Sequence, residues 1–167
     1  MSAAMTGWRE ADGGGGRLVL ERRFRAPRED VWAAVTEPGR LERWIGTWSG
    51  DPADGQVAFR MTAEGEDVAA ETMRIEECEP PSRLRLVSDG WVLELDLAET
   101  PTADGVVTTL RFAQVMPLPE SAAEIGPGWE YYLDRLAAVL AGRDVAGVAW
   151  DDYPALGAPY AAAFADD

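Results

Sequence analysis

Alternating apolar and polar residues, the pattern of a β-strand with one buried face, recur along most of the chain. The clearest case is residues 91–97, where large apolar side chains occupy every second position: Trp91, Leu93, Leu95 and Leu97. Similar alternation predicts further strands at residues 5–10, 17–26, 56–62, 68–77, 83–87 and 106–115. Turn residues separate the strands, including Asp89-Gly90 and the glycine run 13–16.

Apolar residues at helical spacing occur in two regions. After Pro27, which suits the first turn of a helix, Val31 and Val35 predict one short helix, and residues 39–44 predict a second. Nearer the C-terminus, residues 128–141 predict one long helix. Its apolar stripe consists of Trp129, Tyr132, Leu133, Leu136 and Leu140.

This order of elements predicts an α+β fold, because strands that follow one another without intervening helices form an antiparallel sheet. The apolar face of that sheet needs a cover, and the long helix is the only predicted element large enough to provide it. A curved sheet around one helix leaves space, so we expect a pocket between them. We expect an N-terminal segment with a glycine-rich turn (1–16), the main domain (17–142) and an aromatic, acidic tail packed on it (143–167).

The composition excludes several kinds of chemistry. Thirty acidic against 15 basic residues give a net charge of −15, which disfavours nucleic acid and anionic lipid as partners. Histidine is absent, which excludes Ser-His-Asp catalysis and histidine-based zinc sites, and Cys78 is the single cysteine. The sequence has no apolar run of about 18 residues and no secretory signal pattern, so we expect a cytoplasmic protein.

Three motifs appear in the order found in one bacterial protein family. They are RRFRAPREDVWAAVTEP at residues 22–38 followed by Leu41 and Trp44, EPPSRL at residues 79–84, and Gly128-Trp129 followed by residues 132–136 and Leu140. Over residues 17–142 the chain resembles the START-like (SRPBCC) helix-grip superfamily, specifically the bacterial proteins similar to the C-terminal domain of the activator of heat-shock protein 90 ATPase. The resemblance implies a curved antiparallel sheet wrapped around the long C-terminal helix, with two short helices after the first main strand.

The resemblance says less about function, because this superfamily includes lipid carriers, cyclases, hormone receptors and co-chaperones. Relatives often carry one histidine at the end of the last strand and another just after the Gly-Trp of the long helix. This chain has Gln114 and Glu130 at those places, so imidazole chemistry is not expected there.

The candidate site is the expected space between the sheet and the long helix. Apolar residues would line it, and polar residues on the same strand faces, such as Glu71 and Gln114, would orient a ligand. The predicted lining residues are Trp44, Trp48, Phe59, Met61, Glu71, Met73, Trp91, Phe112, Gln114, Trp129 and Tyr132. Ordinary core packing also explains each of the apolar residues in this set.

These observations favour a protein that binds a small hydrophobic or aromatic molecule, with no cofactor and no metal. Two alternatives stay open: a protein-interaction module of the co-chaperone kind, and a cyclase or lyase that uses a buried carboxylate. For the enzyme, Glu71 with Tyr132 is the candidate pair, and the absence of histidine counts against it. We expect no nucleic-acid partner, no membrane insertion, and a monomer or homodimer to which a protein partner could also bind.

Overall fold

The computed structural model describes residues 3–11, 16–63, 68–115 and 121–165. The glycine-rich turn predicted at residues 13–16 lies outside this part of the chain, apart from Gly16. The strands are β1 (Trp8–Glu10), β2 (Arg17–Phe24), β3 (Gly46–Ser49), β4 (Gln56–Met61), β5 (Glu71–Glu79), β6 (Arg83–Ser88), β7 (Trp91–Thr102) and β8 (Gly105–Val115). The α-helices are α1 (Arg28–Thr36), α2 (Pro38–Leu41), α3 (Ala122–Leu140) and α4 (Gly157–Phe164).

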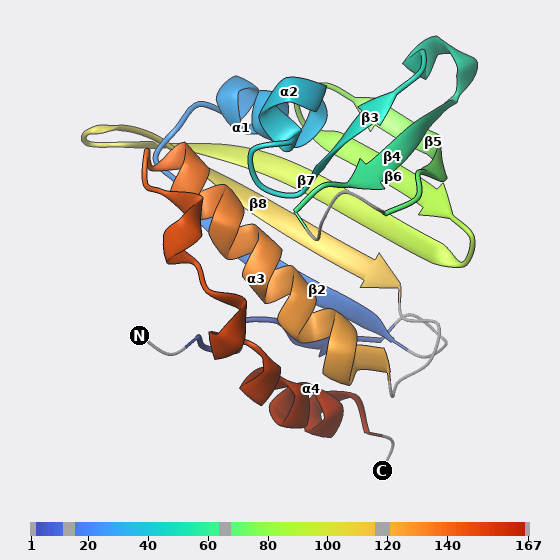
Figure 1. Cartoon of the computed structure of the whole chain (residues 1–167). Coiled ribbons are helices and arrows are strands. Elements are labelled where there is room, and N and C mark those ends of the chain that lie inside the picture. Colours follow the sequence, from blue (N-terminus) through green and yellow to red (C-terminus); the bar gives the residue numbers. More distant parts are fainter. Residues whose placement is uncertain (1–2, 12–15, 64–67, 116–120, 166–167) are drawn as a thin grey trace.

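The strands form one antiparallel sheet in the order β1-β2-β8-β7-β6-β5-β4-β3. The sheet curves, and α3 crosses its concave side in front of β2 and β8, while α1 and α2 cover one end (Figure 1). Helix α4 packs against α3 and β1. This arrangement confirms the predicted α+β helix-grip fold.

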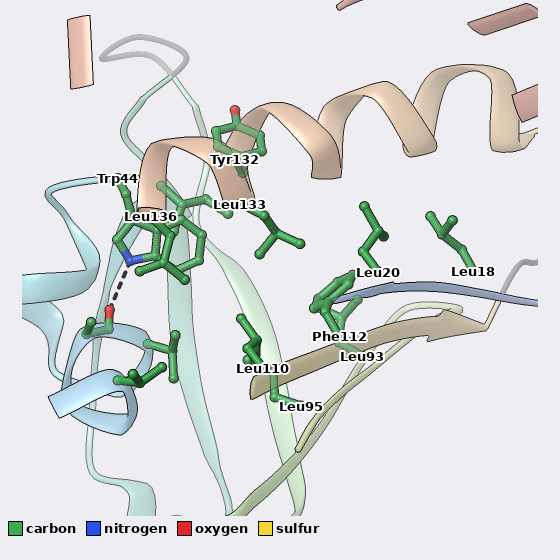
Figure 2. Close-up of a cluster of buried hydrophobic side chains, with 14 of the residues drawn as sticks. Leu18, Leu20, Trp44, Leu93, Leu95, Leu110, Phe112, Tyr132, Leu133 and Leu136 are labelled. Carbon is green, nitrogen blue, oxygen red and sulfur yellow. Dashed lines mark hydrogen bonds between the residues drawn. The ribbon is translucent and has the colours of Figure 1, made fainter. Parts of the chain in front are cut away.

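The core lies between the concave face of the sheet and α3 (Figure 2). Directly opposed residues on neighbouring strands share one face of a sheet, and one such row runs from β2 to β6: Leu20, Phe112, Leu95 and Leu84. Leu133 and Leu136 of α3 pack onto this layer and are almost completely buried. Burial of each such leucine contributes about 1.5–3 kcal/mol, so the layer fixes both the register of the strands and the position of α3.

The main differences from the sequence predictions are β3, the start of α3, and α4, which was not predicted as a helix within the tail. Strand β3 was not predicted, because Gly46–Ser49 contains one large apolar residue and too little alternation to be recognised. Helix α3 begins at Ala122, six residues before the predicted start. The predicted helix left Pro127 outside, whereas Pro127 lies inside α3. Gly126 lets the Tyr160 ring approach closely, because a Cβ there would collide with the ring.

The convex face of the sheet carries an ionic network around Glu94 of β7, a residue that is 6% exposed. Arg17, Arg83 and Arg85 contact its carboxylate at 3.2, 2.7 and 3.1 Å. Burial alone would raise the pKa of Glu94, but the hydrogen bond from Arg83 and the nearby guanidinium charges outweigh it and hold the pKa below its ordinary value. This face is therefore ionic, and the apolar surface of the sheet is on the other side.

Candidate ligand-binding face

The concave face is unevenly covered. Helix α3 packs against β2, and Leu18 and Leu20 of that strand are fully buried. On β4, β5 and β6, by contrast, five apolar side chains are only partly buried: Phe59, Met61, Met73, Ile75 and Leu86. Strand pairing places these five on the same side of the sheet as the core. We call them the uncovered concave face.

The uncovered concave face adjoins two tryptophans that the fold holds in place. Trp48 of β3 lies opposite Phe59, and its indole Nε1 donates a hydrogen bond to the Thr36 carbonyl at 2.7 Å. Trp44 is 4% exposed, and its Nε1 donates to the Ala34 carbonyl at 2.9 Å. Trp44 thus belongs to the core beside α1, whereas Trp48 is partly buried and borders the uncovered surface.

Phe112, Gln114, Trp129 and Tyr132 form a cluster where α3 meets the sheet. The ring centroids of Phe112 and Trp129 are 4.2 Å apart, and those of Trp129 and Tyr132 are 6.3 Å apart. The Trp129 Nε1 donates a hydrogen bond to Gln114 Oε1 at 2.6 Å, and Gln114 is fully buried. The Gln114 Nε2 atom, also buried, has no hydrogen-bond partner.

Glu71 and Trp91 lie apart from this cluster, because they are the first residues of β5 and β7, and Glu71 lies opposite Phe59. Both line an open depression of about 510 Å³, together with polar residues such as Thr72 and Asp89. Trp91 is 42% exposed, and Glu71 is exposed as well. The expectation that these two side chains line an internal pocket is corrected: each lies near a strand end, where no helix covers it. Glu71 is therefore not the buried carboxylate that the cyclase or lyase alternative requires.

A second buried carboxylate besides Glu94 is Glu130 of α3, which is fully buried and which sequence reasoning missed. It accepts hydrogen bonds from the Thr6 backbone and hydroxyl at 2.5 and 2.6 Å, the Gly7 backbone at 3.2 Å, the Tyr160 hydroxyl at 2.5 Å and Arg22 at 2.8 Å. Burial opposes ionisation, but these donors outweigh it and hold the pKa of Glu130 below its ordinary value. Glu130 thus joins both ends of the chain to α3 as a structural anion.

Glu130 is unsuited to act as a general acid or base, because its oxygens are already occupied by five donors within the protein. The signal for this residue was weak in the sequence: it follows the Gly-Trp motif, but its partners lie up to 124 residues away. The Glu130 carboxylate also affects Tyr160: burial and this neighbouring negative charge raise the pKa of the Tyr160 phenol well above its usual range.

The described residues contain no group of three or more histidine, cysteine or carboxylate side chains placed to hold a metal ion. Among the helices of the described ranges, none is long and apolar enough to cross a bilayer. What the site does offer is an apolar surface bordered by the exposed Glu71, which lies opposite Phe59, and a buried amide donor without a partner two strands from Leu86.

Comparison with solved structures supports the fold. The chain is similar to CalU16 from Micromonospora echinospora, with 27% identity, a TM-score of 0.66, and coverage of 99% of this chain and 100% of that one. A protein from Rhodobacter sphaeroides is 26% identical, with a TM-score of 0.56 over 79% of this chain and 96% of that one. EF2215 from Enterococcus faecalis, a conserved protein of unknown function, shares the fold at 17% identity, with a TM-score of 0.71 over 98% and 95% of the two chains.

No curated protein matches the chain. The sequence does match the family described as Activator of Hsp90 ATPase homolog 1-like protein over residues 25–141, which include α1, α2, β3 to β8 and α3. Because this match spans most of the chain and the fold agrees with it, the protein belongs to the Activator of Hsp90 ATPase homolog 1-like family.

Proposed function

We propose that the protein binds a small, uncharged, mainly apolar molecule on the uncovered concave face, beside α3. The observation that supports this most strongly is the partial burial of Phe59, Met61, Met73, Ile75 and Leu86. These side chains lie next to one another on three neighbouring strands. Contiguous apolar surface in a concave region is the usual property of a ligand site.

The charge distribution supports an uncharged ligand. The five side chains of the uncovered concave face are all apolar, and the arginine network around Glu94 lies on the convex face. The net charge of −15 disfavours the approach of an anion. An ionised ligand would therefore lose its hydration on this face and gain no compensating partner from the five side chains.

The size of the surface suggests modest affinity for a simple aromatic compound. A two-ring molecule that buries about 250 Å² of apolar area gains about 6 kcal/mol at 25 cal/mol per Å². Association costs at least about 4 kcal/mol, so about 2 kcal/mol remains, which corresponds to a dissociation constant of about 30 mM. With the size-corrected coefficient of about 45 cal/mol per Å², about 7 kcal/mol remains, which corresponds to about 10 μM. A natural ligand with better complementarity would bind more tightly.

The test uses prodan, a neutral naphthyl ketone whose emission shifts to the blue in apolar surroundings. We expect saturable binding to the wild-type protein. Met73→Glu places a charge on the uncovered concave face and should weaken binding at least about tenfold, which corresponds to 1.4 kcal/mol. The matched control is Thr72→Glu, one residue earlier on the same strand, where the side chain is exposed.

Binding that is absent in the wild type, or equal in the two variants, would contradict the proposal. Both variants change the net charge by the same amount, so a general electrostatic effect on the probe cancels between them. Thermal melts of both proteins establish that each is folded at the titration temperature.

A chaperone-related role is the second candidate, and the family description is the observation that favours it. It predicts that the protein alters the ATPase rate of a bacterial Hsp90. An unchanged rate at micromolar protein, together with prodan binding at the concave face, would favour the small-molecule role.

A further inference from the structure

Gln114 has an unusual environment for a side-chain amide. It lies near the end of β8 and is fully buried, between Leu18 of β2 and Leu93 of β7. The indole Nε1 of Trp129 can only donate a hydrogen bond, so the atom that faces it at 2.6 Å must be the amide oxygen. This contact fixes the orientation of the amide, and the Nε2 group remains without an acceptor.

An unsatisfied buried donor is uncommon in folded proteins and calls for an explanation. A leucine or methionine would fill a similar volume without leaving a polar atom unpaired. The present arrangement instead keeps one oriented N–H donor on the concave side of the sheet, two strands from Leu86. A ligand with an acceptor atom at that point would complete the hydrogen bonding of Gln114.

A continuous row of side chains connects Gln114 to the uncovered concave face. Gln114 is opposite Leu93, Leu93 is opposite Leu86, and Leu86 is opposite Ile75. Along this row Gln114 and Leu93 are buried, whereas Leu86 and Ile75 are partly buried. Three strand spacings, about 14 Å, separate the backbones at its two ends.

We infer that the ligand carries an uncharged carbonyl group, which accepts a hydrogen bond from Gln114 Nε2 while the apolar body lies over Leu86 and Ile75. This inference rests on the proposed function and specifies the chemical class of the ligand. A carbonyl suits the site better than a carboxylate, because an amide is a neutral donor and the protein is strongly anionic. Trp129, which is only partly buried, holds the oxygen of the same amide.

The sequence provides a direct way to observe this contact. It contains two glutamines, Gln56 and Gln114, and no asparagine, so a ¹H–¹⁵N spectrum shows two side-chain amide groups. Gln56 is exposed and lines the depression near Trp91, which makes it an internal control. We would titrate wild-type protein with 2-acetylnaphthalene and with 2-ethylnaphthalene, which lacks the carbonyl oxygen.

The expected result is a downfield shift of the Gln114 amide protons with the ketone, and no comparable shift with the hydrocarbon or at Gln56. If both compounds bind and the Gln114 protons respond equally to each, the carbonyl inference is overturned while the proposed function stands. If neither compound binds and prodan does not bind either, the proposed function itself fails. A response at Gln56 alone would place the site in the depression and contradict both.

A variant gives an independent readout. In Gln114→Met, the dissociation constant of the ketone divided by that of the hydrocarbon should rise about 5-fold or more. This is the change expected for loss of one hydrogen bond to a buried donor. Using the ratio cancels the different hydration of the two compounds. Gln56→Met should leave the ratio within about 2-fold of wild type, and an unchanged ratio in Gln114→Met would overturn the inference.

Discussion

Replacement of Glu130 by glutamine tests how the two ends of the chain are held to the domain. Glutamine keeps the volume and one acceptor oxygen, but it removes the charge and presents an NH₂ group to some of the donors. Arg22 is affected most, because its side chain is 12% exposed and its remaining carboxylate contact is Asp134 at 3.0 Å. Breaking a buried ion pair costs about 3–5 kcal/mol, and Asp134 reduces that loss, so we expect about 3 kcal/mol.

For a chain of 167 residues, this loss corresponds to a decrease in Tm of about 6–12 °C. The assay is thermal unfolding at pH 7, followed by circular dichroism. Glu124→Gln is the matched control, since Glu124 lies on the same helix, is exposed and carries the same charge. It should stay within about 0.5 kcal/mol of wild type. A Glu130→Gln protein that melts within about 2 °C of wild type would refute the anchoring role.

Three further predictions concern the same contacts. The Tm difference between wild type and Glu130→Gln should shrink as the pH falls below 4.5, the ordinary glutamate pKa. The pKa of Glu130 is lower in the folded than in the unfolded protein, so its carboxylate stabilises the fold fully above the unfolded pKa and loses this effect as the pH falls through the folded pKa. A constant Tm difference between pH 7 and pH 3 would contradict this. Gly126→Ala should lower stability by about 2 kcal/mol in urea unfolding, because its Cβ would collide with the Tyr160 ring, whereas Gly128→Ala has open space and should not destabilise the protein. Tyr160→Phe should cost about 1.5 kcal/mol in the same assay, since its hydroxyl donates to Glu130 and accepts from the Gly7 backbone; an unchanged midpoint would show that these bonds do not contribute.

The sheet was largely predictable from sequence because strand periodicity is local. Residues 91–97 alternate so regularly that both the strand and its buried face follow from them, and the structure places Leu93, Leu95 and Leu97 in the core. Trp91 obeys the same alternation but lies at the strand end, where exposure depends on what lies above the sheet. Periodicity describes which way a side chain points, and it contains no information about whether another element covers it.

The contacts of Glu130 and Gln114 could not be predicted for a different reason. The donors to Glu130 come from both ends of the chain, and their meeting depends on how the tail packs against α3. Gln114 was correctly placed on the inner strand face, but its unsatisfied Nε2 becomes visible only once Trp129 is seen to occupy the amide oxygen. Such features arise from tertiary packing of distant segments, and no local pattern encodes them.

The most direct test of ligand binding at the concave face is a prodan titration of protein labelled with ¹³C at the methionine methyl groups. The chain has five methionines; Met61 and Met73 lie on the uncovered concave face, whereas Met5 lies in the N-terminal segment that precedes β1. We predict that the Met61 and Met73 methyl signals shift together, with one saturation curve, while the Met5 signal stays in place. Saturable binding that leaves both Met61 and Met73 unmoved would place the ligand elsewhere and contradict the account.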